Sequence, residues 1–243
     1  MAIHEIQTAA IRLVYLQRPT EHDVAGLRTS LRLHPLDVEE LLGFPRRNVI
    51  RPFRDQLYIA SRWPAYEPLT KELRAVGLQL VVGPGLLVLV DDGACPTIQS
   101  FVDSLMQPAH PLWQASSAAV MAGLLLAMAR WTEQQVNLFA KEIVTSHGDR
   151  DRIDFGQSLE TVSRQLASLE PLLMPIQTNE AEVRLSLRLA VHRCRHQAAE
   201  LLRLQRQPTR QLTPILATRL PRLVGGYAVA SAVVVLIMLF LRS

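Results

Sequence analysis

Several residue types and motifs that would point to particular functions are scarce or missing in this chain. Cysteine occurs only at Cys95 and Cys194, which argues against a disulfide framework and suits a reducing compartment. There is no G-x-S-x-G elbow, Walker loop, G-x-G-x-x-G or C-x-x-C, and no serine has a nearby histidine whose spacing suggests a catalytic triad. We therefore expect a protein that is not an enzyme and holds no tightly bound cofactor.

Uncharged runs of membrane-spanning length are also scarce, and the one that stands out runs from Leu223 to Leu241. Its sequence is LVGGYAVASAVVVLIMLFL, with nothing more polar than Ser231 and Tyr227. Nineteen residues at about 1.5 Å each reach roughly 28 Å, which is one bilayer core. The alternative, a buried core helix, suits such a long and pure segment less well. In the N-terminal MAIHEIQTAAIRLVYL, polar residues interrupt every apolar run, so we expect no signal peptide.

Arginines are unevenly placed around this segment. Arg206, Arg210, Arg219 and Arg222 precede it, and only Arg242 follows it. Because positive charge collects on the cytoplasmic side of a membrane helix, we expect a single-pass protein of the cell (inner) membrane with a cytoplasmic N-terminal body. The four preceding arginines are expected to face lipid head groups.

The stretch from 183 to 222 is strongly basic, with nine arginines against the single acid Glu200, whereas residues 1–182 hold sixteen Lys and Arg against twenty-one Asp and Glu. A basic stretch beside a membrane is attracted to anionic lipids. Nucleic-acid binding would be the other common interpretation, but the stretch contains no aromatic residue on which bases could stack. We expect membrane lipids, and no nucleic acid, as partners.

Residues 1–95 combine strand and helix patterns. The predicted strands are Ala10–Leu16, Gln56–Trp63 and the hairpin arms Val76–Val82 and Leu86–Asp91, joined by Gly83-Pro84-Gly85; the predicted helices are Glu21–Leu33 and Pro35–Leu42. Both hairpin arms are apolar at consecutive positions, which is typical of a sheet covered on two faces. The expected fold is an α/β (α+β) cytoplasmic domain with a mixed sheet between helices.

From residue 96 onward only helical patterns are found. The predicted helices are Pro96–Met106, Trp113–Thr145, Phe155–Leu173 and a neck helix over Glu180–Gln205, with a turn at Gly148–Asp151. Ala115–Ala129 is apolar enough to suggest a second membrane span, but it has 15 residues and continues as an amphipathic pattern, so we expect a buried helix. The expected organisation is 1–95, a long-helix and neck region over 96–207 of the same body, a basic linker over 208–222, and the membrane helix over 223–241.

Two groups of residues could bind a divalent cation. His192, His196 and Glu200 lie four residues apart on one helical face, a spacing that suits a transition metal. The surrounding arginines would repel a cation, so an exposed neck surface is the alternative. Asp91 and Asp92 follow a predicted strand and could hold Mg²⁺ through water, or form a solvated turn.

One stretch resembles a known family. Residues 34–66, HPLDVEELLGFPRRNVIRPFRDQLYIASRWPAY, are similar to the His-Pro-Leu sequence, acidic helix, Arg/Pro turn and aromatic-bearing strand of the CorA family of divalent-cation transporters. The matching residues are His34, Pro35, Leu36, Asp37, Glu39, Pro45 and Tyr58. The hairpin ending LLVLVDDG and the helices over 113–173 also resemble the corresponding parts of that family.

The resemblance implies a homo-oligomer, a pentamer in the family, with Mg²⁺ as the usual ion and cobalt, nickel or zinc as ions of relatives. Family members have two spans and a Gly-Met-Asn filter, whereas the asparagines here are Asn48, Asn137 and Asn179, all in the body. We expect one of the two spans to be missing. Two hypotheses follow: an oligomeric transporter subunit, or a non-conducting, membrane-tethered sensor or accessory protein that assembles with a full-length transporter homologue.

Overall fold

The structure is a computed structural model that describes residues 2–8, 10–25, 39–107, 110–146, 149–173 and 180–206. Its elements are β1 (Ala2–Gln7), β2 (Arg12–Gln17), β3 (Val49–Phe53), β4 (Gln56–Glu67), β5 (Glu72–Gly83), β6 (Leu86–Asp91), α3 (Pro96–Leu105), the 3-10 helix η1 (Pro111–Gln114), α4 (Ser117–Ser146), α5 (Asp149–Leu173) and α6 (Glu180–Arg206). Residues 21–25 and 39–41 are also helical. The elements from β1 to Leu202 of α6 belong to one compact unit.

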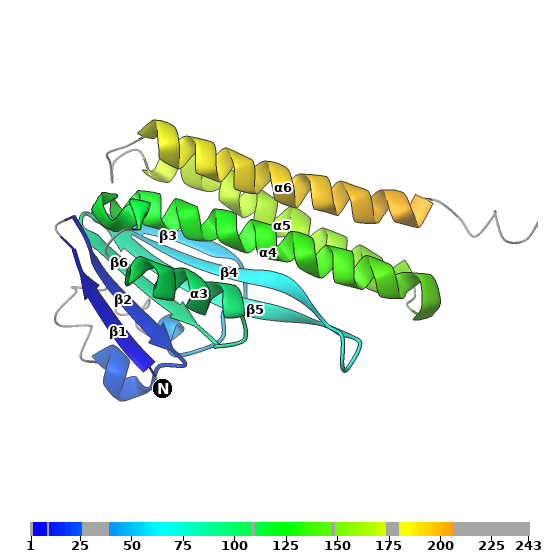
Figure 1. The fold of residues 1–243 in the computed structure, drawn as a ribbon, viewed down its shortest axis with the longest axis horizontal. Coiled ribbons are helices and arrows are strands. Elements are labelled where there is room, and N and C mark those ends of the chain that lie inside the picture. Colours follow the sequence, from blue (N-terminus) through cyan, green and yellow to red (C-terminus); the bar gives the residue numbers. More distant parts are fainter. Residues whose placement is uncertain are drawn as a thin grey trace, which may run out of the picture. The chain divides into compact units, whose positions relative to one another are not determined.

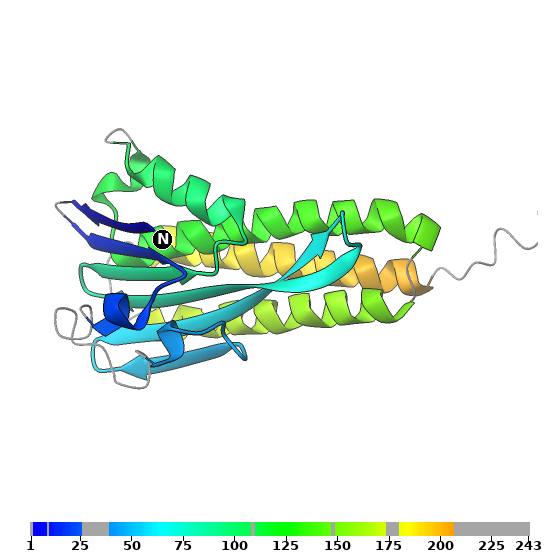
Figure 2. The same cartoon turned by 90° about the horizontal axis from the view of Figure 1, so that it is seen from below.

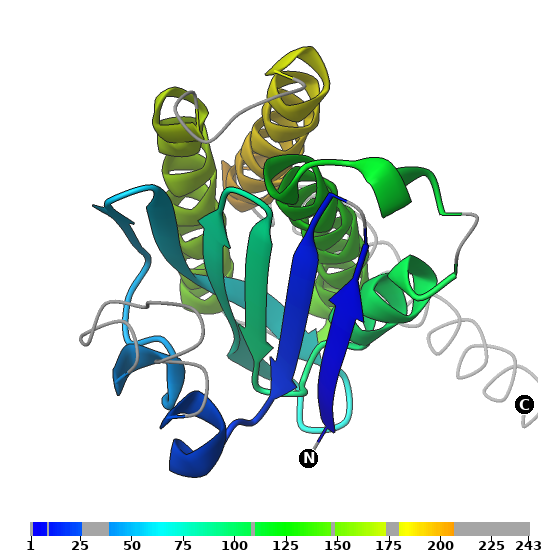
Figure 3. The ribbon, with the colours of Figure 1, turned by 90° about the vertical axis from the view of Figure 1, so that its left-hand side faces the viewer.

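The six strands form one mixed sheet in the order β1-β2-β6-β5-β4-β3. All neighbouring strands are antiparallel except β2 and β6, which run parallel with Gln17 opposite Asp91. A parallel pair needs a long connection, and here the chain passes through β3, β4 and β5 before it returns beside β2 (Figure 3). The mixed sheet and the α+β class predicted from the sequence are therefore confirmed.

The predicted strands are present, but two further strands were missed. β1 reads AIHEIQ and is paired only with β2, at one edge. β3 has the sequence VIRPF and forms the other edge. Pro52 is tolerated there because proline has no N–H and one side of an edge strand needs no hydrogen-bond donors. β4 is longer than predicted and continues through Pro64 to Glu67.

The sheet is covered on both faces, as its apolar strands predicted. One face packs on α4 and α5, and residues of α3 join the same core. α6 lies over α4 and α5, farther from the sheet (Figure 1). The opposite face carries a smaller core in which Val14, Tyr58 and Val88 pack with Val24 and Leu41 from the short helical segments. Successive residues of a strand point to opposite faces, so an apolar run can supply both cores at once.

The apolar stretch of α4 that could have suggested a second span lies in the main core. Val120, Leu124, Leu125 and Met128 are fully buried in the main core, so this stretch is the interior helix that was expected. Within the described ranges, none of the helices has the length and apolar character that a bilayer crossing requires. The expected span, 223–241, lies outside those ranges.

α5 and α6 bury the stripes that their spacing predicted. The buried side chains are Leu159, Val162, Leu166 and Leu169 on α5, and Val183, Leu187, Ala190, Cys194, Ala198 and Leu201 on α6. One detail differs from the prediction. Asp149–Asp151 begins α5 instead of forming a turn, whereas α5 ends at Leu173 as predicted.

The β4-β5 hairpin extends beyond the rest of the sheet and follows the helices (Figure 2). At its outer end Tyr66 packs on Phe139 of α4, with ring centroids 5.3 Å apart, and Phe139 packs on Phe155 of α5 at 5.2 Å. Leu201 of α6 joins this cluster. The aromatic cluster therefore connects the hairpin to all three long helices.

Candidate functional site

Asp91, at the end of β6, is the carboxyl group whose pKa is shifted most in the described part of the chain. Its Oδ1 accepts a hydrogen bond from the Tyr15 hydroxyl at 3.1 Å, and the same hydroxyl lies 3.2 Å from Oε1 of Gln99 on α3. Tyr15 lies two positions before the end of β2, the parallel neighbour of β6, so the two side chains share the helix-covered face. Tyr15 is fully buried and Asp91 is 4% exposed.

Burial dominates the electrostatics of this pair. It raises the pKa of Asp91 to about 6, although the hydrogen bond from Tyr15 acts in the opposite direction. Burial, followed by the negative charge of Asp91, also raises the pKa of Tyr15. Oδ2 of Asp91 is buried and has no hydrogen-bond partner among the described residues. The site is thus a buried carboxyl that exchanges its proton near pH 6.

The side chain of Asp92 accepts hydrogen bonds from backbone N–H groups. Its Oδ1 accepts from the N–H of Ala94 at 3.0 Å, and its Oδ2 accepts from the N–H of Gly77 on β5 at 3.3 Å. Its own carbonyl accepts from Nε of Arg18 at 2.6 Å. Both oxygens of Asp92 therefore accept backbone hydrogen bonds, although Asp91 and Asp92 line the same small cavity. The cation site expected at these two residues stays a prediction.

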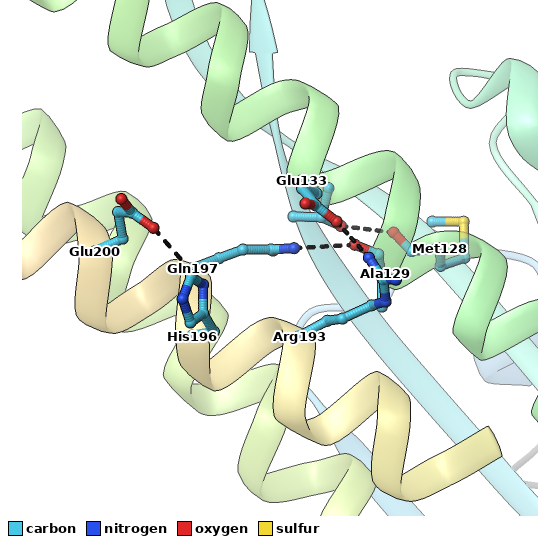
Figure 4. Close-up of polar contacts among 8 residues, drawn as sticks. Met128, Ala129, Glu133, Arg193, His196, Gln197 and Glu200 are labelled. Atoms are coloured by element: carbon cyan, nitrogen blue, oxygen red, sulfur yellow. Dashed lines mark hydrogen bonds and ion pairs between the residues drawn. The ribbon is translucent and has the colours of Figure 1, made fainter. Parts of the chain in front are cut away.

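The second predicted group lies on α6. His192, His196 and Glu200 are on this helix; the two imidazole rings are 6.3 Å apart, and Nδ1 of the exposed His196 lies 3.6 Å from Oε2 of the exposed Glu200. Figure 4 shows this pair apart from the contacts that join α6 to α4. No group of three or more His, Cys, Asp and Glu in the described ranges is placed to hold a metal ion.

The neighbouring residues of α6 fasten it to α4 (Figure 4). Arg193 donates from Nη1 to Oε2 of Glu133 at 2.5 Å, and Nε2 of Gln197 donates to the carbonyl of Ala129 at 3.2 Å. Gln197 is 5% exposed, so its bond lies inside the helix interface. These two polar residues of α6 therefore have a structural use, and His196 lies on the solvent side.

Several predicted residues lie outside the described ranges. These are His34, Pro35, Leu36 and Asp37 of the family stretch; Arg210, Arg219 and Arg222; and Leu223, Tyr227 and Leu241. Glu39 is described and is helical and exposed, and the helix α6 includes Arg206. Tyr15 and Gln99 were missed as partners of Asp91. The only signal for Tyr15 was a phenol within the otherwise aliphatic run LVYL.

The mixed sheet and the helices packed over one of its faces form an α+β fold. The chain is similar to the complete structure of the CorA magnesium transporter from Methanocaldococcus jannaschii, at 12% identity and a TM-score of 0.63, over 89% of this chain and 74% of that chain. The cytoplasmic domain of ZntB from Vibrio parahaemolyticus RIMD 2210633 is similar at 15% identity and a TM-score of 0.57, over 86% of this chain and 89% of that one.

The full-length CmaX protein is also similar, with 12% identity and a TM-score of 0.51, over 92% of this chain and 76% of that chain. No protein-family model matches the sequence, and no curated protein matches it either. At these identities the likeness shows a shared fold. The CorA-like fold expected from residues 34–66 and the helices that follow is confirmed.

Proposed function

We propose that this chain is a CorA-like membrane protein of divalent-cation transport that acts as a homo-oligomeric subunit. The observation that carries the proposal is the extent of the shared fold, since 89% of this chain aligns with 74% of a complete magnesium transporter. Mg²⁺ is the first ion to test, with Co²⁺, Ni²⁺ and Zn²⁺ next. The protein is not proposed to be an enzyme or to hold a resident cofactor.

The sequence supports a membrane location for this function. Residues 223–241 carry no charge, and four arginines precede them. In our proposal this segment anchors the protein as a single helix in the inner membrane, with the body in the cytoplasm and anionic lipids beside the arginines. Copies of the helix would surround the pathway in a pentamer, in which Ser231 is the only small polar side chain within the segment.

A second candidate function is a non-conducting CorA-like sensor or accessory protein that is tethered to the membrane. The observation in its favour is that none of the three asparagines, Asn48, Asn137 and Asn179, follows Gly-Met, so the sequence holds no Gly-Met-Asn. In this role the body would assemble with a full-length transporter homologue and change its activity. The two candidates differ in whether this chain alone lets ions through.

Ion flux into proteoliposomes distinguishes them. The full chain is reconstituted with a Mg²⁺-sensitive dye inside, beside empty liposomes and a homologue that has the filter motif. Transport predicts Mg²⁺ entry above the empty liposomes, and Ser231→Leu should abolish it because the only small polar ring would be lost, while Ser231→Thr should retain it. Absence of entry at a protein density at which the homologue conducts would reject the transporter.

The accessory role has its own readout. If the chain alone is silent, it is reconstituted together with the homologue at rising ratios. A change of the homologue's flux that saturates with this chain supports the accessory role. Unchanged flux, with no co-purification of the two proteins, rejects it.

A further inference from the structure

A cavity of about 590 Å³ lies beside the outer part of β4, between the β-sheet and α5. Its lining is unusually rich in guanidinium groups: Arg46, Arg47, Arg62 and Arg74 all contribute to it. Asn48, Gln157, Ser158 and Thr161 add neutral polar side chains, and Asp154 is the one acidic residue in the lining. Small-molecule sites have volumes of about 300–1,000 Å³, so the cavity is large enough for a ligand.

The cavity lies where β4 loses its neighbour β3, beyond Ala60. β3 pairs with β4 only as far as the Val49–Ala60 pair, so β4 continues from Ser61 to Glu67 without a strand on that side. α5 is held to the same place through Gln165, whose Nε2 donates to the carbonyls of Val49 at 3.0 Å and Ala60 at 2.7 Å. The open strand edge and the helix thus form two fixed walls.

The unpaired edge of β4, from Ser61 to Glu67, cannot accept a further strand. The N–H of Arg62 donates to Oδ1 of Asn48 at 2.6 Å, and the N–H of Tyr66 donates to Oε1 of Gln135 at 3.1 Å. Pro64, between them, has no N–H. Because N–H groups two residues apart on a strand point the same way, the donors that strand addition needs are occupied or absent. A ligand here must be recognised by side chains.

Of the four guanidinium groups, only that of Arg74 has an acidic partner among the described residues. The side chains of Arg46 and Arg47 are exposed and have no acidic partner among the described residues. Arg74 has Glu67 as a partner at 3.4 Å, with both side chains partly exposed, so this pair is weak. Nη1 of Arg62 donates to the carbonyl of Arg46 at 3.1 Å, which orients the guanidinium without cancelling its charge.

We propose that this arginine-lined cavity binds a small, multiply charged phosphate compound, such as pyrophosphate or a nucleoside triphosphate. Planar guanidinium groups match the oxygens of phosphate in pairs, and the hydroxyls and amides on α5 and Asn48 can donate further hydrogen bonds. Three separate segments supply the arginines: the loop after residue 45, β4 and β5. Binding here is distinct from cation transport, so neither assay decides the other.

The test is titration calorimetry on the full chain in detergent at 150 mM salt, with pyrophosphate, ATP, adenosine and a hexaglutamate peptide as separate probes. We expect pyrophosphate and ATP to bind and adenosine not to bind. The double variant R46Q/R47Q should weaken binding at least 30-fold, since about 10-fold is expected for each lost guanidinium contact. Neither of these side chains has an acidic partner among the described residues, so the variant should remain folded.

Matched variants separate a site from general attraction between charges. R130Q/R195Q removes the same charge from exposed positions on α4 and α6 outside the cavity, and should change affinity less than 2-fold. Ser158→Asp places a carboxylate in the cavity at an exposed helix position and should abolish binding, whereas Ser158→Asn should retain it. Equal losses in the two arginine doubles, tighter binding of hexaglutamate than of pyrophosphate, or no binding at 5 mM would each overturn the proposal.

Discussion

Replacement of Asp91 by asparagine should change how the stability of the protein depends on pH. In the unfolded chain this carboxyl ionises near the ordinary aspartate pKa of 3.8, whereas burial raises the pKa to about 6 in the fold. The folded state therefore binds the proton more tightly, so the contribution of Asp91 to stability falls as the pH rises from about 4 to 6 and stays low above that. The full penalty is roughly 3 kcal/mol as an upper limit, because a pKa difference of one corresponds to about 1.4 kcal/mol.

The asparagine variant is neutral at every pH and so lacks this penalty. Relative to the natural protein, D91N should become more stable by about 1.4 kcal/mol between pH 5 and pH 8, which is the part of the penalty that falls in this window. D91N also carries a cost of about 1–3 kcal/mol, because its amide NH₂ takes the place of Oδ2 and is buried where Oδ2 has no hydrogen-bond partner among the described residues. That cost does not vary with pH, so the slope isolates the ionisation.

The assay is urea unfolding of the full chain in detergent at pH 5, 6, 7 and 8, followed by tryptophan fluorescence. Glu160→Gln, at an exposed acid of α5, is the matched control and should show no trend with pH. Tyr15→Phe removes the hydrogen bond that lowers the pKa of Asp91 and should move the transition to higher pH. A constant difference between D91N and the natural protein from pH 5 to pH 8 would refute a raised pKa at Asp91.

Two further results are expected. Gln165→Leu removes three hydrogen bonds, to Val49, Ala60 and Ser61, of which the last two are buried, and should destabilise the fold by about 3 kcal/mol in the same unfolding assay. A Leu at the exposed Gln157 should change stability by less than about 0.5 kcal/mol, and equal effects of the two substitutions would contradict the structural role of Gln165. Burial raises the pKa of the Cys194 thiol to about 12. Iodoacetamide at pH 8 should therefore modify this cysteine at least about 100-fold more slowly in the native protein than in urea, as measured by intact mass. Equal rates would show that the thiol is accessible in the native protein.

The sequence predicted the strands and helices that have a clear apolar pattern, but it did not predict the two edge strands of the sheet. Consecutive apolar residues predicted β5 and β6, and apolar residues three or four positions apart predicted the buried stripes of α5 and α6. β1 and β3 were missed because edge strands are short and mix polar residues, or Pro52, into their patterns. The predicted turn at Gly148–Asp151 was partly wrong because three consecutive polar residues can equally form the first turn of a helix, as Asp149–Asp151 do in α5.

The sites were predicted less well than the fold for a different reason. Asp91 was recognised, but its partner Tyr15 lies 76 positions away and meets it only through the parallel pairing of β2 with β6. The four arginines of the cavity come from three segments whose spacing carries no signal, and only the adjacent pair Arg46 and Arg47 is visible as a motif. Long-range contacts of this kind depend on strand order, which no local pattern encodes.

The parallel pairing of β2 with β6 also determines when the protein can fold on the ribosome. β2 is among the first segments made, yet its neighbour is completed 76 residues after Tyr15, which is roughly 4–15 s at ordinary rates of translation. The helix that covers the main face, α4, emerges later still. Until then the nascent chain exposes the apolar side of an unfinished sheet, so its early synthesis is the period in which it most needs the protection of chaperones.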